Sequence, residues 1–240
     1  MKTSSPRSWR QVLAAGVLAL SITACSTSGT TDDAVQVSVT DLEAILPTAE
    51  EVGKGYQVQP STDDDSGSDD VTDAAIEAAC PGLEEAFGDI GDENEDSNVA
   101  EVAMLDQEGR GFEVKVNAEP TLDPETVDEK IDMVNGCDVI KINDENDSDI
   151  TIHVDAERID DFGEVGVDLT MDMTVENDAL STPYEISFIG RTFLVGTVSV
   201  TVTVIDGGDP ETFETIPADI DLLDEFSAEM ETRVTDLLAG

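Results

Sequence analysis

The chain has 240 residues, of which 56 are acidic and 11 are basic, and its formal net charge at pH 7 is −45. A surface this acidic repels phosphate backbones, which excludes nucleic acid as a partner. The chain also holds only three cysteines, one histidine and 4% aromatic residues. The acidity selects no ligand, because solubility or a high-salt habitat explains it equally well.

The first 24 residues have the organisation of an export signal. Lys2, Arg7 and Arg10 precede the apolar stretch VLAAGVLALSI, and this order is typical of a signal peptide. The stretch is shorter than the ~20 residues that a membrane-spanning helix needs. The next residues, Ile22-Thr23-Ala24-Cys25, resemble the bacterial lipobox, in which small residues precede a cysteine that is acylated before the signal is removed.

The sequence therefore predicts a lipoprotein signal peptide over residues 1–24 and lipidation of Cys25. The protein would be anchored to the cell membrane on its extracytoplasmic face, since acyl chains bind firmly to a bilayer. An ordinary secretory signal that happens to contain a cysteine is the alternative. Residues 25–39 are small and polar and predict a flexible tether, and residues 40–240 predict a single domain.

The other two cysteines, Cys80 and Cys137, form an even pair in an exported and oxidising setting. We expect a disulfide between them. Two buried free thiols are the alternative.

Three helices are expected in the first half of the domain. Thr40-Asp41-Leu42-Glu43 has the form of a capping box, and Pro47 would end that helix. A second helix is expected around Cys80. A third would begin at Asp123-Pro124 and end at Gly136, immediately before Cys137.

The second half of the chain changes to the period of two that strands have. The segments VAEVAML and GFEVKVN predict a hairpin, in which Phe112, Val114 and Val116 alternate with Glu113 and Lys115. From Val165 to Val175 six apolar residues alternate with a polar face, which favours an antiparallel sheet with one solvated side. The apolar phase slips by one residue near Gly196, which we interpret as a bulge.

An amphipathic helix is expected from about Ala218 to the C-terminus, with a continuous apolar stripe that could cover one face of the sheet. The stripe consists of Ile220, Leu223, Phe226, Met230, Val234, Leu237 and Leu238. The expected fold class is therefore α+β, with a mainly antiparallel twisted sheet covered by N-terminal helices and by the C-terminal helix, and with one disulfide.

A search for catalytic and metal-binding patterns leads to no committed site. His153 is the single histidine and is expected on the solvated face of a strand. The chain contains no nucleophile elbow, Walker loop or dinucleotide-binding glycine pattern. A hydrolase that uses two carboxylates needs only a suitable acid pair, but 56 acids make any such pair uninformative.

The run from Asp144 to Asp149, with Asp155 at the twelfth place, partly follows the calcium-binding EF-hand loop. Asp149 stands where that loop has glycine, so we interpret the run as an acidic hairpin loop with weak cation binding as an alternative. We expect no catalytic residue, no cofactor and no dedicated metal site.

The order of these elements resembles a known family. After the lipobox come the segments DLEAILPTAEEVGKGYQV, IEAACPGL and VDEKIDMVNGCDVI, then a valine-rich meander and the helix LLDEFSAEMETRVTDLL. This layout is similar, from Asp41 to Leu238, to the PknH-like extracellular sensor domains of actinobacteria, some of which are free-standing lipoproteins. Another actinobacterial lipoprotein family of similar build, the LpqN-like group, is a related possibility.

The resemblance implies an extracytoplasmic α+β domain with a cleft for a small ligand. Members often carry two disulfides, whereas the mature chain can make one. We therefore expect a lipid-anchored binding or sensing module without catalytic activity, whose partners are the membrane and an unknown small ligand or envelope component. The alternative is an envelope structural or assembly lipoprotein that acts through protein contact.

Overall fold

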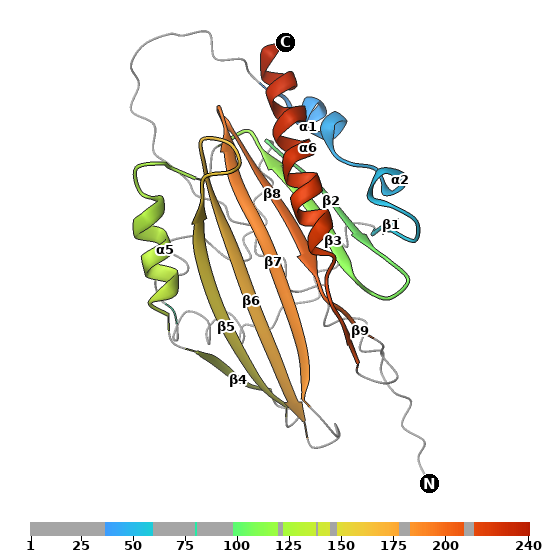
Figure 1. Ribbon diagram of the computed structural model, residues 1–240, viewed down its shortest axis with the longest axis vertical. Helices are drawn as coiled ribbons and strands as arrows, with labels where there is room; N and C mark the ends of the chain where they lie inside the picture. The colour runs from blue at the N-terminus through green and yellow to red at the C-terminus, as the bar shows by residue number, and fades with distance from the viewer. Residues whose placement is uncertain are drawn as a thin grey trace.

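The computed structural model describes residues 37–59, 80, 98–119, 122–137, 139–144, 148–177, 183–208 and 214–240. Four helices and ten strands lie in these ranges (Figure 1). Their bounds in chain order are α1 Val39–Ile45, α2 Ala49–Val52, β1 Gln57–Val58, β2 Val99–Leu105, β3 Gly111–Asn117, α5 Val127–Asn135, β4 Ile140–Asp144, β5 Ser148–Ile159, β6 Val165–Asn177, β7 Tyr184–Val195, β8 Val198–Ile205, β9 Gly207–Gly208, β10 Thr215–Ile216 and α6 Ile220–Ala239.

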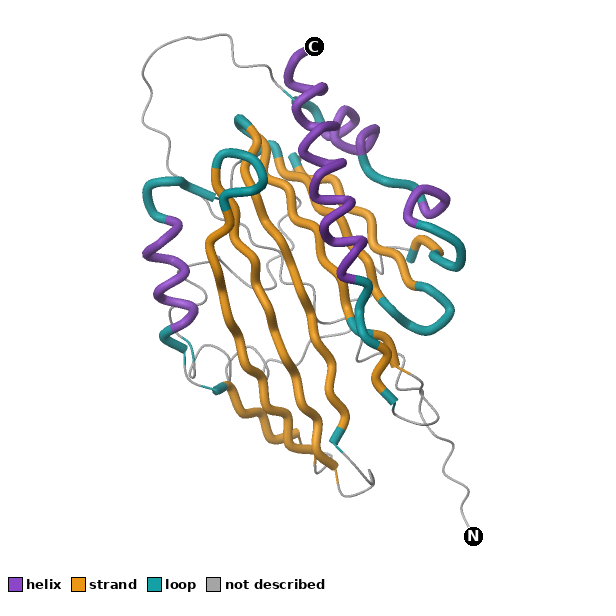
Figure 2. Tube along the Cα trace, viewed as in Figure 1, coloured by secondary structure: helices purple, strands orange, loops and turns teal. Residues whose placement is uncertain are grey.

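One eight-stranded sheet organises the chain, in the order β1-β2-β3-β8-β7-β6-β5-β4. Every neighbouring pair is antiparallel, and β5, β6 and β7 are its longest strands (Figure 2). With helices around this sheet, the structure is of the α+β class that the sequence predicts. A two-stranded sheet of β9 and β10 lies beside it.

The strand register divides the side chains between two faces of the sheet. Face A carries the even-numbered residues of β2, β3, β6 and β8 and the odd-numbered residues of β5 and β7. Face B carries the others, together with Ile140 and Ile142 of β4, which pair with Ile152 and Ile150 of β5. Figure 1 views the molecule from face A, with α6 in front of β8.

Helix α6 covers face A over β7 and β8 and extends toward α1. Its apolar stripe meets the valines of β3 and β8, and Phe226 packs against Phe112 with ring centroids 4.9 Å apart. Each large side chain buried in this way stabilises the fold by roughly 1.5–3 kcal/mol. The stripe is as predicted except at Ile220, which is exposed because it opens the helix.

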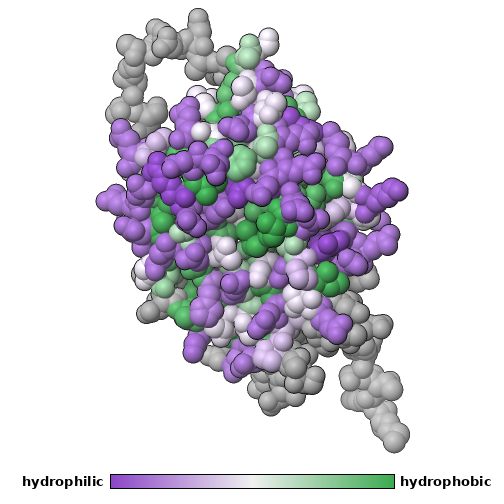
Figure 3. Space-filling view, viewed as in Figure 1, coloured by the Kyte–Doolittle hydropathy of each residue, from purple (hydrophilic) through white to green (hydrophobic). Residues whose placement is uncertain are grey.

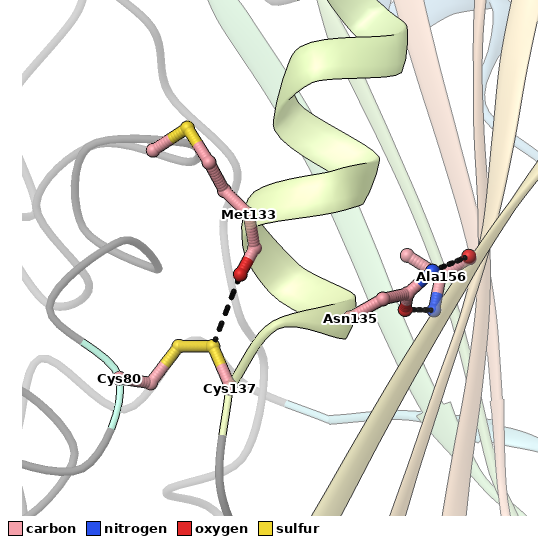
Figure 4. The surroundings of a disulfide bond; sticks show 5 residues. All are labelled: Cys80, Met133, Asn135, Cys137 and Ala156. Atoms are coloured by element: carbon pink, nitrogen blue, oxygen red, sulfur yellow. Dashed lines mark hydrogen bonds between the residues drawn. A yellow bond between two sulfur atoms is a disulfide. The ribbon is translucent and has the colours of Figure 1, made fainter.

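Helix α5 covers face B over β5, at the opposite end of the sheet. Asn135, its last residue, donates to the carbonyl of Ala156 at 2.7 Å and accepts from the Ala156 amide at 2.8 Å (Figure 4). These two bonds satisfy the backbone of β5 and hold the end of the helix against the strand. The core is thus split into two clusters on opposite faces, one under α6 and one under α5.

The predicted disulfide joins Cys80 to Cys137, directly after α5 (Figure 4). The sulfur of Cys137 lies 3.5 Å from the carbonyl oxygen of Met133. This is a sulfur–oxygen contact, since a disulfide sulfur carries no proton to donate. The bond connects Cys80, which is itself buried, to the face-B cluster.

Two local expectations were wrong. The first helix begins at Val39 rather than after Thr40, because Ser38 is its N-cap and forms the capping box with Asp41. The phase slip near Gly196 is a tight hairpin rather than a bulge. Val195 pairs with Val198 across the turn, so the odd residues of β7 and the even residues of β8 reach the same face without an extra residue in either strand.

Several predicted segments lie outside the described residues. They are the signal peptide and lipobox with Cys25, most of the expected tether, and the helix expected around Cys80, of which only Cys80 itself is described. The helix α1 begins at Val39, and Val37 packs against the face-A cluster.

Candidate functional site

Face B changes character across the sheet. Over β4, β5 and β6 it is apolar and belongs to the cluster beneath α5. In the middle of β3, β8 and β7 it carries polar side chains, although β7 also presents the buried apolar residues Ile186, Phe188 and Leu194 on this face. We name this second region the polar strip, and it consists of Glu113, Lys115, Gly190, Thr192, Thr201 and Thr203.

The polar strip forms two rows across three adjacent strands. In the first row Glu113 of β3 lies opposite Thr203 of β8, which lies opposite Gly190 of β7. In the second row Lys115 lies opposite Thr201, which lies opposite Thr192. Residues directly opposite each other have Cβ atoms about 4.5–5.5 Å apart, so the side chains within each row are close enough to hold one ligand group between them.

Strict alternation in the sequence places these side chains on face B. In VSVTVTVI of β8 the valines enter the core beneath α6, which turns Thr201 and Thr203 to the other side of the sheet. In GFEVKVN of β3 the same alternation turns Glu113 and Lys115 with them. Threonine is common in strands for its branched side chain alone, but a buried glutamate has no such explanation.

Glu113 is the unusual group of the strip. It is 3% exposed, and its Oε2 atom has no hydrogen-bond partner among the described residues. Burial, aided by the nearby negative charge of Glu101 and opposed by Lys115, raises the pKa of this carboxyl to about 8. At neutral pH the carboxyl is therefore mostly protonated and uncharged.

The one base in the strip is held by another acid. The Lys115 ammonium lies 3.8 Å from the Glu101 carboxylate on β2, the residue directly opposite it. The two charges offset each other, and Glu113 remains as the acid without a counter-ion. A buried polar group that lacks a partner costs free energy, and carboxyl groups with strongly shifted pKa values cluster at functional sites.

The remaining members of the strip supply hydroxyl groups and space. The hydroxyls of Thr192 and Thr201 are 3.0 Å apart and share a hydrogen bond. Thr201 and Thr203 are half-buried. Beside Thr203, a Cβ built on Gly190 would meet only the Thr203 Oγ1 atom among the described residues, at 3.5 Å. Gly190 thus adds no side chain of its own to the first row.

Chemically, the strip can donate and accept hydrogen bonds and can supply one carboxylate when Glu113 loses its proton. Hydroxyl groups and one buried carboxyl suit recognition of a polar or cationic group. Within the described ranges no cluster of three or more His, Cys, Asp or Glu side chains is arranged to hold a metal ion.

The residues considered from the sequence lie apart from this strip. His153 is exposed on face A, opposite Asp172, which is where the sequence places it. Asp144 ends β4 and pairs with Ser148 of β5, so the acidic run connects a hairpin as expected, although residues 145–147 lie outside the described part. The lipidation residue Cys25 lies outside it too.

Sequence reasoning did not single out Glu113. The alternation in β3 correctly assigns this side chain to the face opposite Phe112, but it does not say that this part of the face is buried. The available signal was the run of alternating threonines in β8, which is too uniform and too uncharged for an exposed strand in so acidic a chain.

Face A also carries polar side chains, where α6 does not reach. The exposed residues of this second surface, which we name the bare face, are Asp149, His153, Asp155 and Glu157 of β5, Asp172 and Glu176 of β6 and Glu185 of β7. Glu157 stands directly opposite Asp168 in the register. Hydrophilic residues dominate this view of the molecule (Figure 3).

Comparison with known proteins identified no relative. No protein-family model, no curated protein and no solved structure matches the chain. Among the helices of the described ranges, none combines the length and the apolar character that crossing a membrane requires.

Proposed function

We propose that the protein is a lipid-anchored binding or sensing module on the extracytoplasmic face of the cell membrane, and that it recognises a small ligand or an envelope component at the polar strip. The observation that carries the proposal is the buried carboxyl of Glu113, which has no partner among the described residues and lies opposite the Thr203 side chain. A ligand that supplies the missing partner would repay the cost of burying this group.

The anchor in this proposal rests on the sequence before Cys25. A cationic segment, a short apolar stretch and a lipobox-like site lead to a cysteine. The pairing of Cys80 with Cys137 supports export, because stable disulfides form in oxidising compartments.

Labelling with radioactive palmitate tests the anchor. Expressed in a bacterial host that modifies lipoproteins, the chain should incorporate the label and sediment with membranes. The variant Cys25→Ser should do neither. A wild-type chain that stays unlabelled, or whose mature form begins at another residue, contradicts the anchor and the assigned location.

The proposal contains no catalytic step. The strip has no histidine or thiol beside its hydroxyls, because His153 is exposed on the other face and both described cysteines are in the disulfide.

Native mass spectrometry tests the binding function. Protein purified from its membrane should carry a bound small molecule, and the variant Thr203→Val, which keeps the shape of the side chain but removes its hydroxyl, should carry less of it. Val202→Ala changes the other face of the same strand and serves as the control for a general loss of stability. A wild-type protein that carries nothing, both as purified and after incubation with an envelope extract, contradicts the binding function.

The second candidate function is structural or assembly work through protein contact. The bare face favours it, since the directly opposed and exposed acids Asp149 and Glu176 would be neutralised by a basic partner surface. Crosslinking in intact cells separates the two functions. A single membrane partner crosslinked through β5, together with an empty polar strip, would favour assembly.

A further inference from the structure

We propose that the ligand of the polar strip is a small organic cation, bound through a primary ammonium group with Glu113 as its counter-ion and Thr203 as a hydroxyl acceptor. This inference rests on the proposed binding function and adds the chemical class of the ligand.

The charges around Glu113 point to a cation rather than an anion. Of the described residues that face it, Glu101 and Lys115 are charged and compensate each other, and the facing residues of β8 and β7 are uncharged. One acid is therefore left without a counter-ion. The net charge of −45 also raises the local concentration of cations and lowers that of anions.

The geometry fits an ammonium group better than a larger cation. A primary ammonium has three donors and requires several acceptors in a small volume. Glu113 Oε2 is buried without a partner among the described residues, the Thr203 side chain lies directly opposite it, and Gly190, next in the row, adds no side chain. A planar guanidinium would need a wider, forked arrangement of acceptors.

Binding in this way couples to a proton. An alkylammonium group titrates near 10, as lysine does, so it stays charged at neutral pH. Glu113, with a pKa of about 8, must release its proton to form the ion pair. Below pH 8 each bound cation therefore displaces one proton from Glu113 to the buffer, and charge and protons balance. Affinity should rise with pH and level off above 8.

Isothermal titration calorimetry on the full mature chain in detergent tests the inference. The probes are 1,4-diaminobutane and its uncharged counterpart 1,4-butanediol, at constant ionic strength. The diamine should bind and the diol should not. A pKa of about 8 predicts an affinity at pH 8.5 about 25 times that at pH 6.5. At pH 6.5 two buffers with different ionisation enthalpies should reveal about one proton released.

Matched variants locate the effect. Glu113→Gln keeps the size of the side chain and should abolish both the binding and the pH dependence. Asp155→Asn removes the same charge from the bare face and should change neither. Thr203→Val should weaken binding several-fold and keep the pH dependence, which tests the assignment even if Glu113→Gln folds poorly.

Three results would overturn the inference. The diamine could give no heat at millimolar concentration, or it could bind equally well to Glu113→Gln and Asp155→Asn, which would assign it to the acidic surface in general. The diol could bind instead, in a Glu113-dependent way and without proton release. This last result leaves the strip as a binding site, so it overturns the cation and not the proposed function.

Discussion

Glu113 is a carboxyl group that the fold holds in its uncharged form. In the unfolded chain its pKa has the ordinary value of 4.5, whereas in the folded protein burial raises it to about 8. Below pH 4.5 both states are protonated and the difference has no effect. Between the two values the unfolded state releases a proton that the folded state keeps, so the stability of the fold falls as pH rises.

This linkage leads to a prediction for a single substitution. From pH 4.5 to 8 the wild type should lose up to about 5 kcal/mol of unfolding free energy through Glu113. Glu113→Gln should remove that loss. The unfolding free energy of the variant, relative to that of the wild type, should therefore increase as pH rises. Urea unfolding at pH 5 and pH 8 measures both.

The charge-matched control for this experiment is Asp155→Asn on the bare face. Between pH 5 and pH 8 the unfolding free energy of this variant should change by the same amount as that of the wild type. A Glu113→Gln variant whose pH dependence equals that of the wild type would show that Glu113 titrates normally, and the polar strip would then lose its distinguishing feature.

At the level of helices and strands, Arg191 attaches α6 to the sheet. Its guanidinium makes two parallel bonds to Asp168 of β6, at 2.7 and 2.8 Å, and a third to Asp224 of α6, at 2.7 Å. It also lies over the ring of Phe162, 4.7 Å from the centroid. Through Asp168, Asp224 and Phe162, Arg191 connects β7 to β6, to α6 and to the β5–β6 loop. These contacts lie at the edge of the part of face A that α6 covers.

Arg191→Lys should therefore destabilise the fold by about 2 kcal/mol. Lysine keeps the charge but cannot make the forked pair or stack in the same way. The control is Arg158→Lys, whose partners Asp128 and Asp160 are exposed, and this change should destabilise the fold much less than Arg191→Lys. Equal losses in urea unfolding would contradict the role of Arg191 as the connection between α6 and the sheet.

Taken as a whole, the molecule is dominated by its negative charge. Removal of the predicted signal peptide takes three of the 11 bases and none of the 56 acids, which leaves eight bases and a formal charge of −48. Such charge destabilises a compact state by self-repulsion. The distance over which this repulsion acts falls from about 10 Å at 0.1 M salt to about 3 Å at 1 M.

The melting temperature should therefore rise by several degrees between about 0.05 and 1 M sodium chloride. Calorimetry or circular dichroism measures it. Tetramethylammonium chloride at the same ionic strength separates screening from specific binding of sodium. Screening predicts the same rise in melting temperature with either cation. A melting temperature that does not change with salt concentration would show that the acids are too far apart, or too well neutralised, to repel one another.

Secondary structure was largely predictable because it depends on local periodicity. The strict alternation from Val165 to Val175 and the stripe from Leu223 to Leu238 each identify one element and its apolar side. Both are confirmed by the structure. The cap at Ser38 and the hairpin at Gly196 were missed because they depend on one or two residues whose neighbours offer equally good alternatives.

The candidate site could not be predicted in the same way. The alternating pattern predicts that Glu113 and Thr203 lie on one face of the sheet and Phe112 on the other. It does not predict whether the face of Glu113 is exposed to solvent. That depends on which segments pack over each part of the sheet, and these are distant in sequence.

Residue order alone established the strands, the terminal helix and the even pair Cys80 and Cys137, since each follows from periods or counts along the chain. The three-dimensional packing established that the core is divided between two faces, with Phe193 in one cluster and its neighbour Leu194 in the other. It also buried Glu113 without a partner. Burial is a property of contacts between distant segments, and no local pattern encodes it.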